Sequence, residues 1–138
     1  MLDLGSGGGL PGLVIATRLR NVSVVLTDRR ERRMDLLRLA CARLSLDSRV
    51  TVLTVDVVAL ARDPAFRGRF DVVTARAFGD PLWTLACAVP FLGDGGVIVV
   101  SEPPHVDEDL RWPQAEVDQL GLVPSPQSFA HVKRFEPA

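Results

Sequence analysis

The 138-residue sequence has few of the side chains that hold metals or take part in redox chemistry. It contains two cysteines, two histidines and no Cys-x-x-Cys pair, and neither His105 nor His131 has partner ligands at the spacing of a metal site. Cys41 and Cys87 lie on apolar stretches, where a free thiol behaves as a small hydrophobic side chain. We therefore expect no metal, surface positions for both histidines, and a reducing, cytoplasmic compartment.

Long apolar runs are also missing. Stretches such as Val97–Val100 are far shorter than the roughly 20 residues needed to cross a bilayer. Met1 leads directly into Asp3 and a glycine cluster rather than into a basic and then apolar leader, so neither a membrane span nor a signal peptide is predicted. Apolar residues still make up 47% of the chain, which excludes disorder and predicts one domain, residues 1–138, with a buried core.

Lysine is nearly absent, because 15 of the 16 basic residues are arginine. Residues 1–76 contain 13 basic and 8 acidic residues, a balance of +5, whereas residues 77–138 contain 3 basic and 9 acidic residues, a balance of −6. This polarity is compatible with an anionic partner such as a nucleic acid on one side of the molecule, and equally with an ordinary solvated surface.

Short β-branched runs alternate with segments of helical periodicity. The expected strands are Leu2–Leu4, Val22–Leu26, Val50–Val55, Phe70–Thr74 and Val97–Val100. The expected helices are Leu10–Arg20, Arg30–Leu44, Val57–Arg62, Pro81–Phe91 and Leu110–Leu120, with a turn at 93–96 and a hairpin between Val123 and Phe135. The alternation predicts a Rossmann-like α/β fold: a doubly wound, mostly parallel sheet, helices on both faces, and a ligand at the carboxyl ends of the strands.

A glycine-rich loop, Gly5–Gly9, follows the first expected strand. Glycines there permit positive φ and close approach of a ligand to the backbone, although a tight turn without a ligand is an alternative. The dinucleotide pattern GxGxxG is met formally from Gly7 onward, but it begins two residues late and encloses Pro11. The pattern DxGxGxG, which begins at Asp3, resembles motif I of the class I S-adenosylmethionine (SAM) methyltransferases. An acidic first position suits the protonated amino group of SAM and would repel a pyrophosphate.

Two further acidic residues end later strands. Asp28, 25 positions after Asp3, can accept hydrogen bonds from both ribose hydroxyls of an adenosine, or it can cap the following helix. Asp56 ends the third strand. By resemblance to SAM enzymes of this class, Asp56 and Val57 would flank adenine, and a helix cap is again the alternative.

Three segments together resemble one family, the bacterial small-subunit ribosomal RNA guanine-N7 methyltransferases, also called glucose-inhibited division protein B. DLGSGGGLPGLVIA resembles the family's DxGSGxGxPG signature, and LTDRRERRMDLLR is similar to its second-strand segment with a basic pair, here Arg32 and Arg33. FDVVTARAF is similar to its fourth strand, which ends in Ser/Thr-Arg-Ala. The resemblance runs from about Leu2 to about Val100. It implies SAM as cofactor and ribosomal RNA, or the small ribosomal subunit, as partner.

The motifs and the resemblance together predict two sets of site residues. The cofactor set is Asp3, Gly5, Ser6, Gly7, Gly9, Leu10, Asp28, Arg29, Asp56, Val57 and Arg76. The substrate set is Arg76, Phe78, Arg32 and Arg33. For the arginines at 29, 30, 32 and 33 a solvated helix face is the alternative to phosphate contact, and for Arg76 a surface ion pair. Phe78 is expected to be open for base stacking, and Trp83 is expected in the core.

The chain also departs from the family pattern. No helical segment precedes the glycine motif, and Ser101-Glu102-Pro103-Pro104 stands where the family usually has Lys-Gly. Glu102 is thereby a candidate to stabilise a cationic methylated ring. Three other interpretations stay open: a small-molecule or protein methyltransferase, a SAM-binding module inactive without an N-terminal segment or partner, and an NAD-binding domain, which Asp3 and Pro11 disfavour.

Overall fold

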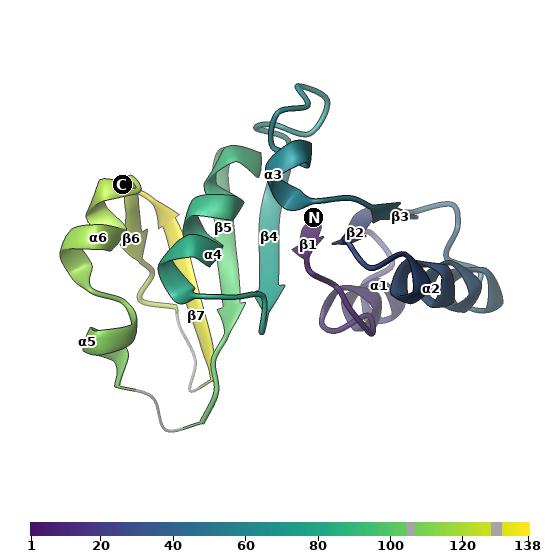
Figure 1. The fold of residues 1–138 in the computed structure, drawn as a ribbon, viewed down its shortest axis with the longest axis horizontal. Helices are drawn as coiled ribbons and strands as arrows, with labels where there is room; N and C mark the ends of the chain where they lie inside the picture. Colours follow the sequence, from purple (N-terminus) through teal and green to yellow (C-terminus); the bar gives the residue numbers. More distant parts are fainter. Residues whose placement is uncertain (105–106, 128–130) are drawn as a thin grey trace.

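The computed structural model describes residues 1–104, 107–127 and 131–138, and its central feature is a seven-stranded sheet of order β3-β2-β1-β4-β5-β7-β6 (Figure 1). The strands are β1 (Leu2–Leu4), β2 (Val24–Asp28), β3 (Val50–Thr54), β4 (Phe70–Arg76), β5 (Leu92–Ser101), β6 (Leu122–Pro124) and β7 (Val132–Pro137). The helices are α1 (Gly12–Arg18), α2 (Glu31–Arg43), α3 (Val57–Leu60), α4 (Pro81–Ala88), α5 (Glu108–Arg111) and α6 (Gln114–Gln119), with a 3-10 turn η1 at Val89–Phe91. Strands β1 to β5 pair in parallel and β7 pairs antiparallel with β5, which confirms the predicted fold class.

The strand order places a topological switch point beside β1. The chain runs outward from β1 to β2 and β3, then returns to β4 on the other side of β1. Because such crossovers are right-handed, the helices before β3 and those after it cover opposite faces of the sheet. Figure 1 shows α1 and α2 beside β2 and β3, and α4 over β5. A crevice therefore opens at the carboxyl ends of β1 and β4, where doubly wound folds bind ligands.

Two hydrophobic cores hold the helices to the sheet. The smaller core joins α1 and α2 to β2 and β3, and in α2 it uses Met34, Leu37 and Cys41, which recur at helical spacing. The larger core joins α3, α4 and α6 to the central strands. Ile98 of β5 points into this larger core, whereas its neighbours Val97 and Val99 are only half-buried on the other face.

The sequence predicted a turn at residues 93–96 before the fifth strand, and this prediction is wrong, because β5 includes these residues. Phe70 pairs with Leu92 and Val72 pairs with Val97, so these glycines form an irregularity within β5 rather than a turn before it. Gly95 has φ +70, and a Cβ on Gly96 would lie 2.7 Å from the carbonyl oxygen of Phe70. The glycines thus allow β5 to bulge while it stays against β4.

The prediction of one continuous helix over Leu110–Leu120 is also wrong. The structure has two short helices, α5 and α6, separated at Pro113, which has no backbone N–H to continue the hydrogen-bond ladder. The expected hairpin is confirmed, because β6 and β7 pair antiparallel at the edge of the sheet. His131 is exposed as expected, and His105 lies outside the described residues.

Both cysteines are buried free thiols, as their apolar surroundings predicted. Burial raises the pKa of each thiol, and nearby carboxylates add to the effect. In the described part of the chain, no helix combines the length and the apolar character needed to span a bilayer. No group of three potential metal ligands occurs in that same part.

Candidate functional site

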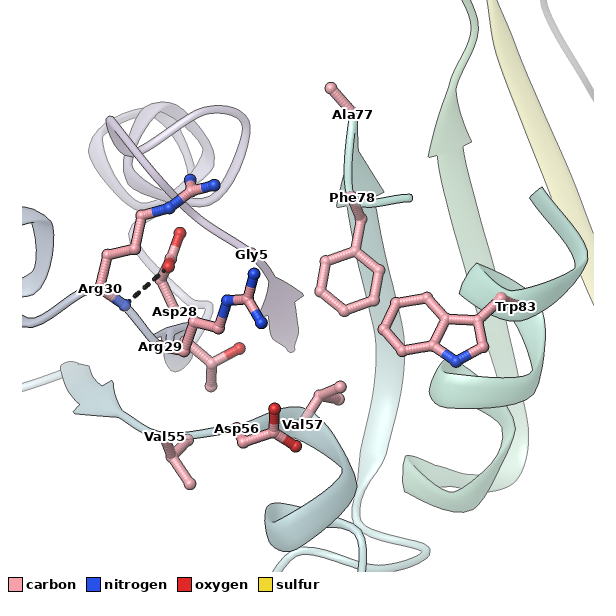
Figure 2. Close-up of a pocket in the computed structure, with 11 residues that line it drawn as sticks. Gly5, Asp28, Arg29, Arg30, Val55, Asp56, Val57, Ala77, Phe78 and Trp83 are labelled. Atoms are coloured by element: carbon pink, nitrogen blue, oxygen red, sulfur yellow. Dashed lines mark hydrogen bonds between the residues drawn. The ribbon is translucent and has the colours of Figure 1, made fainter. Parts of the chain in front are cut away.

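A pocket of about 290 Å³ lies at the carboxyl ends of the central strands (Figure 2). It is lined by Gly5, Thr27, Asp28, Arg29, Arg30, Val55, Asp56, Val57, Ala77, Phe78 and Trp83. Except for Trp83, which is in α4, these residues lie at or just after the carboxyl ends of β1, β2, β3 and β4, so four strands that end at the same edge of the sheet contribute to the pocket. The pocket is where the predicted fold should bind a ligand.

The glycine loop is held to β2 by the hydroxyl of Ser6. This oxygen donates to the carbonyl of Asp3 at 3.0 Å and accepts from the backbone N–H of Thr27 at 3.0 Å. Gly5 has φ +64, and a Cβ there would lie 2.6 Å from Cδ2 of Phe78. The loop conformation therefore requires glycine at position 5, while Ser6 is buried beneath the loop and does not line the pocket.

Asp3 also lies under the loop. Its carboxylate, 0% exposed, accepts a hydrogen bond from Oγ1 of Thr74 at 2.7 Å and another from the backbone N–H of Gly12 at 3.1 Å. Burial raises the pKa of Asp3, while these hydrogen bonds partly oppose the rise. The group thus connects β1 to β4 and to the start of α1. Direct contact between Asp3 and a cofactor stays a prediction, and this placement does not favour it.

Asp28 is not the N-cap of α2 that the sequence offered as an alternative, because Arg30 holds that position and no side chain caps the helix. One carboxylate oxygen accepts from the backbone N–H of Arg30 at 2.9 Å, which fixes the start of α2, and the other accepts from the N–H of Gly7 at 3.2 Å (Figure 2 shows the first). Each carboxylate oxygen can accept a second hydrogen bond, and the residue lines the pocket. The hydrogen bonds of Asp28 to the glycine loop and to the turn before α2 therefore leave room for a ligand, and ribose contact stays a prediction.

Asp56 caps α3 and borders the same pocket. Its Oδ1 accepts hydrogen bonds from the backbone N–H groups of Val58 at 2.8 Å and Ala59 at 3.4 Å. Asp56 and Val57 both line the pocket, in its lower part as drawn in Figure 2. The cap that the sequence offered as an alternative is present, and adenine contact stays a prediction.

Trp83 is not in the core, contrary to expectation. Its side chain is 47% exposed and stacks on Phe78, with ring centroids 5.1 Å apart and an angle of 14° between the planes. The sequence was misleading because α4 is apolar on nearly every side. The Asp80-Pro81 pair before it was the missed signal, since a cap and a proline at the start of a helix place residue 83 in the first turn, close to the strand ends.

The structure brings only part of the predicted set together. Of those residues, Gly5, Asp28, Arg29, Asp56, Val57 and Phe78 line the pocket, while Asp3, Ser6, Gly7, Gly9, Leu10, Arg76, Arg32 and Arg33 do not. Arg76 is exposed at the end of β4, and Arg32 and Arg33 are exposed in the first turn of α2. Thr27, Val55 and Ala77 line the pocket without having been predicted. Ala77 has φ +48, an unusual conformation for a residue with a Cβ, next to the site.

Glu102 is engaged elsewhere and is not available to stabilise a methylated base. Its Oε1 accepts from the indole N–H of Trp112 at 2.9 Å, and its Oε2 lies 2.5 Å from Nε of Arg111 in an ion pair. Glu102 also does not line the pocket. The suggestion made from its sequence position is therefore not supported.

Comparison with known proteins assigns the chain to a family. The family model GidB, described as rRNA small subunit methyltransferase G, matches residues 1–134. Among solved structures, the chain is similar to a SAM dependent methyltransferase from Aquifex aeolicus, with a TM-score of 0.71 and 14% identity over 99% of this chain and 79% of that one. It is also similar to an O-methyltransferase family protein from Burkholderia thailandensis, with a TM-score of 0.71 and 17% identity over 99% of this chain and 49% of that one. At these identities the two structures support the fold alone.

Relatives named "Ribosomal RNA small subunit methyltransferase G" are closer in sequence. The one from Prochlorococcus marinus (strain MIT 9303) is 39% identical over 126 residues, which cover 86% of this chain and 51% of that protein. The one from Rubrobacter xylanophilus is 38% identical over 120 residues, which cover 86% of this chain and 45% of that protein. The chain thus spans about half the length of these relatives. With a family model matched over residues 1–134, the chain belongs to the rRNA small subunit methyltransferase G (GidB) family.

Proposed function

We propose that the chain is a SAM-dependent methyltransferase domain that transfers a methyl group to guanine N7 of small-subunit ribosomal RNA. The observation that most supports this is the pocket at the switch point, where the glycine loop, Asp28 and Asp56 come together in a chain of this family. The names of the relatives, which are ribosomal RNA methyltransferases, support the RNA part of the proposal.

The residues present fit an adenosyl cofactor. Asp28 offers further lone pairs to ribose hydroxyls, and Gly5 lines the pocket beside the ring of Phe78, which packs where a side chain at position 5 would lie. Val57 would supply an apolar contact for adenine, and Asp56 an acceptor at its edge. When bound, SAM supplies a methyl group already activated on a sulfonium.

Methylation of guanine N7 requires little acid–base catalysis from the residues of this chain. Guanine N7 has a free lone pair, so no proton must be removed before attack. The residues around the pocket therefore act by positioning the reactants and excluding water, which can lower a barrier by roughly 7–11 kcal/mol. This is consistent with a site that contains no nucleophile–base pair among its lining residues.

The RNA backbone would meet the arginines at the start of α2. Arg29 and Arg30 line the pocket, and Arg32 and Arg33 are exposed one turn further along. They lie at the same edge of the sheet as the cofactor pocket, so phosphates held there would bring a base toward it.

A second candidate rests on the length of the chain. The chain spans about half the length of these relatives. In this second candidate function, the chain binds SAM but transfers a methyl group only when a further segment or a partner is present. Two experiments separate these possibilities.

The first experiment measures SAM binding by calorimetry for the chain and for Asp28→Asn, with NAD as a competing candidate ligand. We expect binding of SAM and not NAD, and a 10- to 100-fold weaker affinity for Asp28→Asn, since a hydrogen bond to a charged group contributes about 1.5–3 kcal/mol. Asp94→Asn, at the opposite end of β4 and β5, is the control and should bind normally. Equal affinities for both variants would remove Asp28 from the site.

The second experiment incubates the chain with methyl-labelled SAM and undermethylated small ribosomal subunits. Label recovered as 7-methylguanosine supports the full proposal. SAM binding without transfer supports the binding-module alternative, and transfer to free small molecules or protein supports a different substrate class.

A further inference from the structure

Trp83 exposes a large apolar surface that the packing of the fold does not use. The chain's other tryptophan, Trp112, is 5% exposed, packs against Phe135 with the two rings tilted, and donates its indole N–H to Glu102. Trp83 is 47% exposed, and its ring borders the pocket rather than the larger core. An open indole at a concave site is suited to a planar ligand.

Contacts with neighbouring residues fix the position of the Trp83 indole. The carboxylate of Asp80 accepts from the backbone N–H of Trp83 at 3.1 Å, and Pro81 begins the same helix. A Cβ on Gly79 would lie 3.2 Å from Cε3 of Trp83, so the link between β4 and α4 passes close to the ring. The indole is therefore oriented before any ligand arrives.

Phe78 forms, together with Trp83, the aromatic side of the pocket. It stacks on Trp83 and touches the glycine loop at Gly5, so the two rings extend from the loop to the rim of the pocket. Figure 2 shows Asp28 and Arg29 on the other side of the pocket, with Asp56 and Val57 beneath. The resulting space has aromatic surface on one side and hydrogen-bonding groups on the others, a combination that suits a heteroaromatic base.

We infer that the Phe78–Trp83 pair is a stacking surface for a purine ring and that Trp83 sets the affinity for that ring. The inference rests on the proposed function, because the purine is either the adenine of the cofactor or the target guanine of the RNA. Both offer the same flat, π-rich face, and stacking of a base on an aromatic side chain changes affinity by roughly 5- to 150-fold when that side chain is removed.

The test compares the wild-type chain with Trp83→Leu, which keeps an apolar side chain but removes the flat ring, and with Trp83→Phe, which keeps a ring. The probes are S-adenosylhomocysteine, and a guanine-containing oligonucleotide of the substrate RNA with S-adenosylhomocysteine at saturation. Affinities come from calorimetry, and acrylamide quenching of tryptophan fluorescence reports whether the exposed indole becomes covered. Leu36→Ala, an exposed apolar position on α2, is the matched control and should bind both probes normally.

If the ring stacks adenine, Trp83→Leu should weaken S-adenosylhomocysteine binding about 5- to 150-fold, and Trp83→Phe should restore most of it. If it stacks guanine, the affinity for S-adenosylhomocysteine should stay within twofold of wild type while oligonucleotide affinity falls by the same range. Wild-type binding of both probes by Trp83→Leu would overturn the inference and leave the proposed function intact. Absence of S-adenosylhomocysteine binding by the wild-type chain would overturn both.

Discussion

Among single residues, Asp3 combines complete burial with a titratable group. Because burial raises its pKa above the ordinary value, the folded state binds a proton at this site more tightly than the unfolded state does. Its contribution to stability is therefore fully present below the unfolded pKa and is lost as the pH rises through the folded pKa.

Asp3→Asn should remove that pH dependence. Relative to this variant, the wild-type free energy of unfolding should fall as the pH is raised from about 4, the region of the unfolded pKa. Urea denaturation of both proteins between pH 4 and 8 measures the difference. A difference that grows in favour of the wild type as pH rises would contradict the assignment.

Gly12 shows how a missing side chain can be required. A Cβ at this position would lie 2.4 Å from Cδ2 of Leu26 and 2.6 Å from the carboxylate of Asp3. Gly12→Ala should therefore destabilise the chain by about 1–3 kcal/mol, as overpacked sites do. Gly8→Ala is the matched control, because nothing lies within 4 Å of its Cβ, and it should stay within about 0.5 kcal/mol of wild type in the same thermal denaturation.

At the scale of elements, most strands and helices follow from local pattern. The helix that presents Met34, Leu37 and Cys41 to the sheet has apolar residues at helical spacing, and the short strand at Leu2–Leu4 is marked by the glycine loop that follows it. What could not be predicted depends on tertiary context. The glycines at 93–96 stay in β5 because β4 lies beside them. Trp83 is a different case, because the Asp80-Pro81 pair that starts α4 was a local signal that the sequence interpretation missed.

The candidate site divides in the same way. The positions of Asp28 and Asp56 were predictable because Asp28 ends β2 and Asp56 follows the end of β3, and the ends of parallel strands share one edge. The burial of Asp3 depends on Thr74, which is 71 residues away in sequence, and no local pattern contains that contact.

Glu102 joins the end of β5 to α5 and to the segment after it. Glu102→Ala removes the acceptor of the Trp112 indole and the partner of Arg111, so we expect a loss of about 1–3 kcal/mol in stability. SAM affinity should stay unchanged, because Glu102 does not line the pocket. Calorimetric unfolding and ligand titration on the same sample check both statements. Weaker SAM binding by a fully folded variant would return Glu102 to the site.

For the whole molecule, the uneven charge has a measurable consequence. If RNA phosphates bind the arginines of α2, the affinity for substrate RNA should fall steeply with salt, and the slope should decrease by about 0.7–0.9 for each contact removed. Arg32→Ala and Arg33→Ala should each reduce the slope of RNA affinity against salt concentration. Arg69→Ala, just before β4 at the opposite end of the strands, should not. Filter binding at several salt concentrations gives the slopes, and a slope shared by all three variants would favour the solvated-face interpretation.

The hydrogen bonds of Asp28 mechanically join the two halves of the site. One oxygen secures the glycine loop and the other secures the turn that begins the arginine-bearing helix. A nucleoside anchored to this carboxylate would therefore stiffen the turn that presents the arginines. The nucleoside and the polynucleotide would then bind cooperatively, because the ligand that binds first would order the turn and lower the entropy cost of binding the second.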